Sequence, residues 1–252
     1  MHISIKANVK DFKRQLSSFE KKQLPFAISS GINLTAENVR EALYLEMWRV
    51  FHKPVAYTVP RNLEKLSNRK AGALFIVPAK KRRPQARVFV KEMSFGKGTP
   101  ALNYLEPHIK GGGRRTKGSE VALRSRGVIG SGKYITPSTK SPYGHVKLNR
   151  AGNVTSGVMN KVLSGLNSLR GLPKGSESRQ TESYFAMRRG GPGTETGIWR
   201  RSGKGLEKLF NVTNQPQYRV RFHYGSVGRK TVDRNIVRNL DRAMADAIRT
   251  AF

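Results

Sequence analysis

Two clusters of basic residues are the parts of this sequence best suited to bind an anion. The first is the run of four cations that begins at Lys80, and the second lies in a glycine-rich stretch that begins at Gly111. Guanidinium and ammonium groups on loops can follow a phosphate backbone and release its counterions, and an acidic protein surface attracts the same groups. The sequence leaves DNA and an acidic protein equally open as the partner. The candidate contacts are Lys80, Lys81, Arg82, Arg83, Arg114, Arg115, Lys117, Arg124 and Arg126.

Residues 127–134 (GVIGSGKY) come close to a phosphate-binding loop. Gly127 and Gly132-Lys133 have the spacing of the G-x-x-x-x-G-K-[ST] motif, but Tyr134 stands where Ser or Thr would bind Mg²⁺. The preceding residues, LRSR, are a poor match to the buried strand that the motif requires. We therefore interpret 127–134 as a linker. A nucleotide-dependent enzyme stays open as an alternative that only this stretch favours.

Catalytic and metal-binding patterns do not emerge from the rest of the sequence. The five histidines are scattered, and none forms a ligand pair with a carboxylate at helical or turn spacing. No G-x-S-x-G motif occurs, and no pair of acidic residues stands out as general acid and base. No helix-turn-helix, zinc-finger or ribonucleoprotein pattern is present, which disfavours reading of a base sequence. We expect no enzymatic activity, no catalytic residue, no metal and no cofactor.

The composition is that of a protein that works among anions. The 252 residues include 48 Lys and Arg against 16 Asp and Glu, a formal net charge of +32. Because so large an excess cannot be paired within the chain, we expect a polyanionic or acidic partner. The sequence has no Cys, no apolar run long enough to span a bilayer and no signal-peptide pattern. These features disfavour a secreted or membrane protein and predict a cytoplasmic product with no membrane partner.

Periodic segments predict an α+β fold in which a long N-terminal helix and a C-terminal helix pack on a small, mostly antiparallel sheet. Apolar residues at helical spacing indicate the helices, and alternating or β-rich runs indicate the strands. The first two strands form a hairpin that carries the four-cation run at its tip. The predicted elements are helices at 25–51, 158–169 and 232–251 and strands at 73–78, 87–90 and 218–224.

The domain organisation predicted from these elements is a single domain over residues 1–252, with long, basic, glycine-rich loop insertions at about 91–150 and 171–205. The first insertion is expected to become ordered only against neighbouring proteins, with protease-sensitive sites between Arg114 and Arg126 in the free protein. Trp199 is expected to anchor the second insertion to the core. A further helical stripe, formed by Phe12, Leu16 and Phe19, precedes the long helix.

The order of these segments resembles that of the tail-completion and minor tail proteins of tailed bacteriophages, the "minor tail protein Z" type at the head–tail junction. The resemblance covers most of the chain and contains no catalytic signature. The residues that carry it are Leu24-Pro25-Phe26-Ala27, Asn33-Leu34-Thr35-Ala36, Gly111-Gly112 with Arg114, Asn149-Arg150-Ala151-Gly152-Asn153, Gly197-Ile198-Trp199-Arg200, Tyr218–Phe222 and the helix that ends in Ala247…Ala251.

This resemblance implies a virion structural protein that is made in the host cytoplasm and added late in assembly to the neck or tail. It implies a homo-oligomeric ring around a DNA channel, with portal or connector, tail-tube or terminator proteins as partners and with non-specific contact to genomic DNA. The larger glycine-rich middle departs from the shorter members of the family. A non-specific nucleic-acid-binding protein, free in the cytoplasm, stays open as the alternative that charge alone favours.

Overall fold

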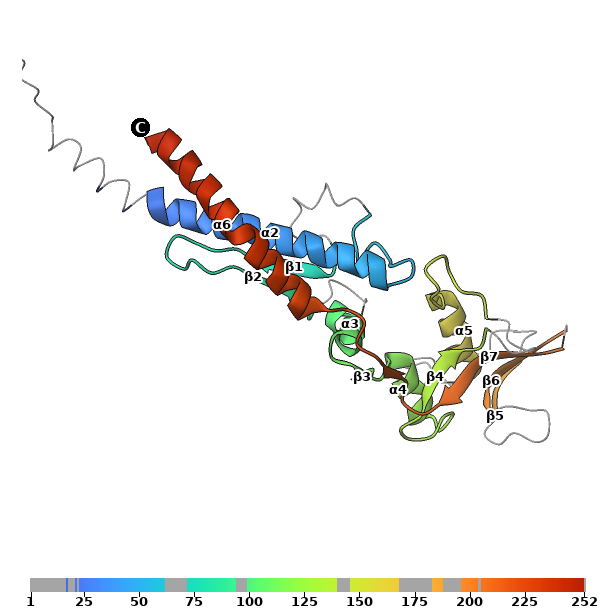
Figure 1. The fold of residues 1–252 in the computed structure, drawn as a ribbon. Coiled ribbons are helices and arrows are strands. Elements are labelled where there is room, and N and C mark those ends of the chain that lie inside the picture. Colours follow the sequence, from blue (N-terminus) through green and yellow to red (C-terminus); the bar gives the residue numbers. More distant parts are fainter. Residues whose placement is uncertain are drawn as a thin grey trace, which may run out of the picture. The chain divides into compact units, whose positions relative to one another are not determined.

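The computed structural model of the protein describes Ser17, Lys21 and residues 23–61, 72–93, 99–139, 146–167, 183–187, 196–203 and 205–251. The predicted stripe of Phe12, Leu16 and Phe19 lies outside these residues. The chain divides into two units, one from Met1–Leu102 with Arg221–Phe252 (unit 1) and one from Asn103–Val220 (unit 2). Two long helices and small antiparallel sheets make the fold α+β, which confirms the predicted class (Figure 1).

Unit 1 is built around two long helices, α2 (Leu24–Val50) and α6 (Tyr224–Ala251), which pack against each other. α2 has a Pro in its first turn, where the missing N–H has no helical partner to lose. Ala27, near the start of α2, packs against Ala243 and Ala247, near the end of α6, so the two helices run antiparallel. Further along, the buried Asn239 side chain donates hydrogen bonds to Thr35 Oγ1 (3.1 Å) and to Asn38 Oδ1 (2.8 Å). These polar contacts fix the register of the pair, because a shift along either helix would leave the Asn239 amide without its partners.

Gly31 marks the closest approach of the two helices. A Cβ atom at this position would lie 2.9 Å from the Leu240 Cα and 3.0 Å from the Asn239 carbonyl oxygen. Gly228 of α6, by contrast, would place a Cβ 3.8 Å from Val39, an ordinary contact distance. The helices therefore require glycine at one of these two positions and tolerate it at the other.

We expect Gly31→Ala to lower the stability of unit 1 and Gly228→Ala to raise it. Alanine favours a helix over glycine by about 1 kcal/mol, and at Gly228 nothing opposes that gain. At Gly31 the new methyl forces two backbones apart, which costs about 1–3 kcal/mol and outweighs the gain. Urea denaturation of both variants measures the difference, and equal shifts of the same sign would contradict the close helix crossing.

A β-hairpin packs on α2 in the same unit. β1 (Leu74–Val77) pairs antiparallel with β2 (Arg87–Val90), with Leu74 opposite Val90 and Val77 opposite Arg87. The backbone N–H of Leu74 donates to the hydroxyl of the buried Tyr44 (3.1 Å). The strands predicted at 73–78 and 87–90, and their pairing as a hairpin, are therefore confirmed.

Unit 2 contains a four-stranded antiparallel sheet in the order β4-β7-β6-β5, with helices around it and a short β3-β8 pair. A bulge interrupts the β6-β7 register between Ile198 and Trp199. Its elements are α3 (Ala101–Lys110), which begins at the unit boundary, β3 (Gly112–Gly113), α4 (Gly118–Ser125), β4 (Tyr134–Pro137), α5 (Ser156–Gly165), β5 (Ser183–Met187), β6 (Gly197–Ser202), β7 (Gly205–Thr213) and β8 (Gln217–Tyr218).

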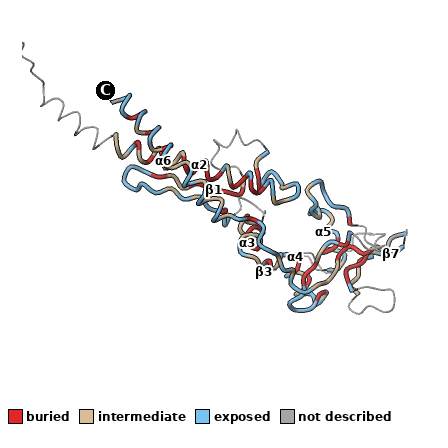
Figure 2. Tube along the Cα trace, viewed as in Figure 1, coloured by how far each residue is buried: buried red, intermediate tan, exposed pale blue. Residues whose placement is uncertain are grey.

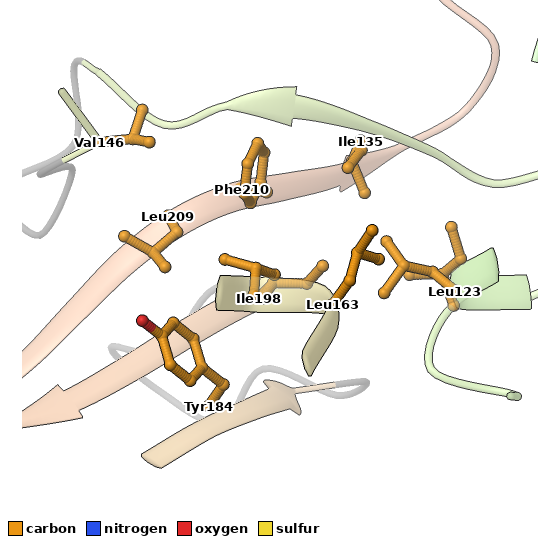
Figure 3. Packing of buried hydrophobic residues seen from close by; sticks show 10 residues of the cluster. Leu123, Ile135, Val146, Leu163, Tyr184, Ile198, Leu209 and Phe210 are labelled. Atoms are coloured by element: carbon orange, nitrogen blue, oxygen red, sulfur yellow. The ribbon is translucent and has the colours of Figure 1, made fainter. Parts of the chain in front are cut away.

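The side chains of these elements form a hydrophobic core that belongs to unit 2 alone. Figure 3 shows residues from two helices and four strands converging on it. Ile198 of β6 and Leu123 of α4 are fully buried in this core. Trp199 is also buried, with 2% exposure, as expected for a residue that anchors its segment. The labelled members of the cluster are Leu123, Ile135, Val146, Leu163, Tyr184, Ile198, Leu209 and Phe210.

The second core corrects the predicted domain organisation. The stretch 91–150 contains α3, β3, α4 and β4, and the stretch 171–205 contains β5 and β6, so neither is a loop insertion into one core. The described part of 91–150 is therefore not a structureless loop, and whether it is ordered in the free protein stays a prediction that proteolysis would test. Each of these elements is short and contributes few buried residues, and β3 contributes none, so no sustained periodicity exists in the sequence. The sheet brings these residues together.

The segment that connects unit 2 to α6 also differs from the prediction. The alternation at 218–224 predicts a strand, but only Gln217–Tyr218 is β-structure, and α6 begins at Tyr224 rather than at 232. Phe222 is fully buried and packs its ring against Phe51 and Tyr224, whereas Val220 is 47% exposed. The aromatic residues therefore anchor a connecting segment and do not line one face of a sheet.

Candidate functional site

The four-cation run lies at the tip of the β1–β2 hairpin, as the sequence predicts. The backbone N–H of Lys80 donates to the carbonyl of Arg83, and the N–H of Arg83 donates to the carbonyl of Lys80, both at 2.9 Å. Lys81 and Arg82 form the two-residue turn between them. Neither has a positive φ, so the turn requires neither Gly nor Asn at its corner. Both corner positions can therefore carry a cation without backbone strain.

The tip is fixed to helix α2 at two points. The Asn33 side chain pairs with the backbone of Ala79, accepting from its N–H at 2.7 Å and donating to its carbonyl at 3.1 Å. The Lys81 ammonium group lies above the ring of Phe26, 5.3 Å from its centroid, which is a cation–π distance. Pro78 and Pro84 flank the tip and restrict its backbone further. The four cations therefore lie on a turn whose position on α2 is fixed by these contacts.

All four cations are exposed, and the tube of the loop between β1 and β2 is coloured mainly as exposed in Figure 2. None of them forms an ion pair with any carboxylate in the part of the chain that the structure describes. Arg49, Lys110, Arg115, Arg200 and Arg249, in contrast, each pair with an acidic side chain of their own unit. The hairpin tip therefore has its charge available for an external anion.

Arg114, a member of the second predicted cluster, has a structural role. It is 8% exposed and forms a bidentate ion pair with Glu120, which is fully buried; one of the two N–O distances is 2.9 Å. Its guanidinium also donates to the carbonyls of Arg115 (3.1 Å) and Ile135 (3.2 Å). The prediction that Arg114 contacts DNA or an acidic partner is wrong, because an interior carboxylate and two backbone carbonyls already occupy its donors.

The Glu120 carboxylate organises the start of α4. It accepts hydrogen bonds from the backbone N–H of Lys117 (2.8 Å), as the N3 residue of a capping box does, and from that of Ile135 (3.0 Å). Burial by itself raises the pKa of Glu120, but the hydrogen bonds from Arg114, Lys117 and Ile135 outweigh it, and the net pKa is lowered. The carboxylate is therefore ionised at neutral pH.

Arg124 is a second cation with a structural role. Its guanidinium donates to the carbonyl of Lys133 (3.0 Å) and to Thr116 Oγ1 (3.2 Å). Arg114 and Arg124 both lie 4.9 Å from the centroid of the Tyr134 ring, so two guanidinium groups stack on one aromatic side chain. This arrangement joins α4 to the start of β4.

The remaining members of the second cluster are exposed but do not form one site. Arg115 pairs with Glu106 at 3.1 Å. Lys117 precedes α4, where desolvation and the positive charge of Arg114 lower its pKa. Arg126 follows α4 with no side-chain hydrogen bond or ion pair to the described residues. The structure therefore divides the nine predicted contacts into four exposed cations at the hairpin tip of unit 1, two cations with internal partners in unit 2 (Arg114 and Arg124) and three further exposed cations in unit 2.

The loop at 127–134 has the wrong surroundings for a nucleotide site. Helix α4 precedes it and strand β4 follows it, whereas a phosphate-binding loop connects a strand to a following helix. Gly127 and Gly132 have positive φ angles of 64° and 70°, which a turn explains. The Lys133 ammonium group donates to Asn214 Oδ1 at 2.7 Å. The interpretation of this stretch as a linker is confirmed.

The sequence analysis missed a second basic surface, on α6. Four cations at a spacing of four residues are all exposed and lie about 6 Å apart along the helix. The spacing of four is visible in the sequence and could have indicated this surface, but the sequence analysis used only the apolar residues of the same helix. These residues are Lys230, Arg234, Arg238 and Arg242.

The described residues contain no group of three or more His, Asp or Glu side chains that could hold a metal ion. None of their helices has the length and apolar character needed to cross a membrane. Comparisons with protein-family models, curated protein sequences and solved structures found no match to this chain.

Proposed function

We propose that this protein is a non-enzymatic structural subunit of a tailed-phage particle, of the tail-completion or neck type, that contacts a polyanion through its hairpin tip. It assembles with further copies into a ring and joins portal or connector proteins to the tail tube or its terminator. The observation that carries the proposal is the braced hairpin tip, whose four exposed cations have no partner among the described carboxylates. The order of segments along the chain, which resembles that of the tail-completion family, supplies the location in the particle.

The internal use of Arg114 and Arg124 also favours a structural role. In unit 2 the side chains of Arg114, Glu120 and Arg124 connect α4 to β4 and to the residues that follow β3. A structural subunit needs such rigid units together with a charged surface for its neighbours.

We expect mass spectrometry to detect this chain in tailed particles purified from cultures that carry its gene. Particles assembled with the Lys80→Ser, Lys81→Ser, Arg82→Ser and Arg83→Ser variant (the tip variant) should show lower infectivity, through defects in joining, DNA retention or DNA transit. The folded protein should persist, because substitutions of exposed charges usually change stability by less than about 0.5 kcal/mol each.

A matched control removes four exposed charges from unit 2 instead. Its substitutions are Lys147→Ser, Arg150→Ser, Lys161→Ser and Arg219→Ser (the control variant). Normal infectivity of the control and reduced infectivity of the tip variant would support the proposal. Absence of the chain from purified particles would reject the virion role and leave the soluble nucleic-acid-binding protein, which the same hairpin tip favours.

A further inference from the structure

We infer that the partner of the hairpin tip is the phosphate backbone of duplex DNA, bound without regard to base sequence. This inference deepens the proposed function, since it names the polyanion that the tip contacts. It rests on the backbone geometry of the turn, on the chemistry of the side chains around it and on the charge of unit 1.

The turn brings like charges together with no acid between them. Lys80 and Arg83 exchange both backbone hydrogen bonds, so they are directly opposite each other and their side chains share one face of the ribbon. Such a pair has Cβ atoms about 4.5–5.5 Å apart, and like charges placed there repel each other. Lys81 and Arg82, at the corner, add two further charges. An anion bound between these groups removes the repulsion, so the tip is arranged for a ligand with closely spaced negative charges.

The surroundings of the tip favour a nucleic acid over an acidic protein. Protein interfaces are built around a core of apolar and aromatic anchors within a polar rim. Residues 80–85 contain no apolar side chain other than that of Pro84, and the nearby Phe26 ring is already in contact with the Lys81 ammonium. A phosphate backbone needs no such anchor, because ionic contacts and counterion release provide the binding energy.

The turn is closed before any partner binds, because Lys80 and Arg83 exchange two backbone hydrogen bonds. The fixation of the hairpin to α2 through Asn33 reduces the conformational entropy that binding would otherwise cost.

The wider charge of unit 1 supports the same partner. Its two chain segments contain 27 Lys and Arg against 10 Asp and Glu, and α6 contributes the exposed cations that begin at Lys230. A long polyanion can contact exposed cations over the whole unit. A small anion interacts only with the cations near it, because salt screens charges more than about 8 Å away at physiological ionic strength.

The test is a salt titration of DNA binding by the full-length protein. Fluorescence anisotropy of a labelled duplex of random sequence gives Kd at a series of NaCl concentrations for wild type, the tip variant and the control variant. Each phosphate contact contributes about 0.9 to the slope of log K against log salt, so loss of four contacts should reduce the slope of the tip variant by about 3–4. The control variant loses the same net charge and should keep a slope within about 1 of wild type. Duplexes rich in A·T or in G·C should bind wild type equally.

Three outcomes would overturn the inference. The first is a tip variant that keeps the wild-type slope of log K against log salt. The second is a control variant that loses as much of this slope as the tip variant. The third is a tip variant that loses binding to polyglutamate and retains DNA binding, which would make an acidic protein the partner. Failure here is distinct from failure of the proposed function, because the titration uses isolated protein, whereas detection of the chain in purified particles does not depend on what the hairpin tip binds.

Discussion

Glu120→Gln is expected to destabilise unit 2 by about 3–5 kcal/mol, the usual cost of removing one partner from a buried ion pair. The substitution keeps the shape of the side chain but leaves the Arg114 guanidinium, 8% exposed, without a counter-charge. It also weakens the acceptor for the N–H groups of Lys117 and Ile135. The expected loss is comparable to the whole stability of many domains.

The two tryptophans make this measurement specific to one unit. Trp48 lies in α2 of unit 1 and Trp199 in β6 of unit 2. In a Trp48→Phe background, fluorescence during urea unfolding reports the environment of the buried Trp199 and hence of unit 2. Glu106→Gln, which removes the partner of the exposed Arg115, serves as the matched control and should cost less than about 1 kcal/mol.

The acid dependence of unit 2 gives a second readout for the same variant. Because the folded-state pKa of Glu120 is lowered, its contribution to stability is fully present above the unfolded pKa of about 4.3 and is lost as the pH falls through the folded pKa. Wild type should therefore lose this contribution below about pH 4, whereas Glu120→Gln has already lost it at every pH. If both proteins show the same stability at pH 7, Arg114 and Glu120 do not form a buried pair.

Leu43→Asp is expected to destabilise unit 1 by several kcal/mol. Leu43 is fully buried on α2, and an aspartate there would either carry an unpaired charge into the core or bind a proton to avoid it. In a Trp199→Phe background, Trp48 fluorescence follows the unfolding of α2 and its partners.

Leu45→Asp provides the control on the same helix. Leu45 is 53% exposed, so the same change of residue type two positions along should alter stability by no more than about 0.5 kcal/mol. A similar loss for both variants would mean that the substitution acts through helix propensity and that Leu43 is not in the core. Val220 lies in the stretch 218–224 for which the sequence predicts a strand, but its exposure of 47% means that Val220→Asp should behave like Leu45→Asp.

The elements that the sequence predicts well are those whose pattern is local and repeated. α2 has apolar residues over seven turns, and the hairpin has two β-rich runs around a polar tip, so both could be located within a few residues. The exposure of Lys80–Arg83 follows from the same pattern, since a tight turn at the end of a hairpin has little to pack against.

The second basic cluster could not be interpreted from local pattern. Arg114 looks like its neighbour Arg115 in the sequence, and what separates them is a fully buried carboxylate, Glu120, six residues further along. The spacing from Lys117 to Glu120 resembles a capping box and could have indicated the start of α4. Nothing local indicates that Ile135 closes the same network, because that contact depends on how β4 lies in the sheet.

The pairing of α2 with α6 has a consequence for how the chain is made. The two helices that form the core of unit 1 come from opposite ends of the sequence, with all of unit 2 between them. Unit 2 has its own core and becomes complete on the ribosome once Val220 has emerged. The end of α6 follows the end of α2 by about 200 residues, so at the usual elongation rate of about 5–20 residues per second α2 waits roughly 10–40 seconds for its complete partner helix. During that interval its buried stripe, which includes Ala27 and Gly31, is open to chaperones and to other nascent chains, and it is covered only when α6 has been translated.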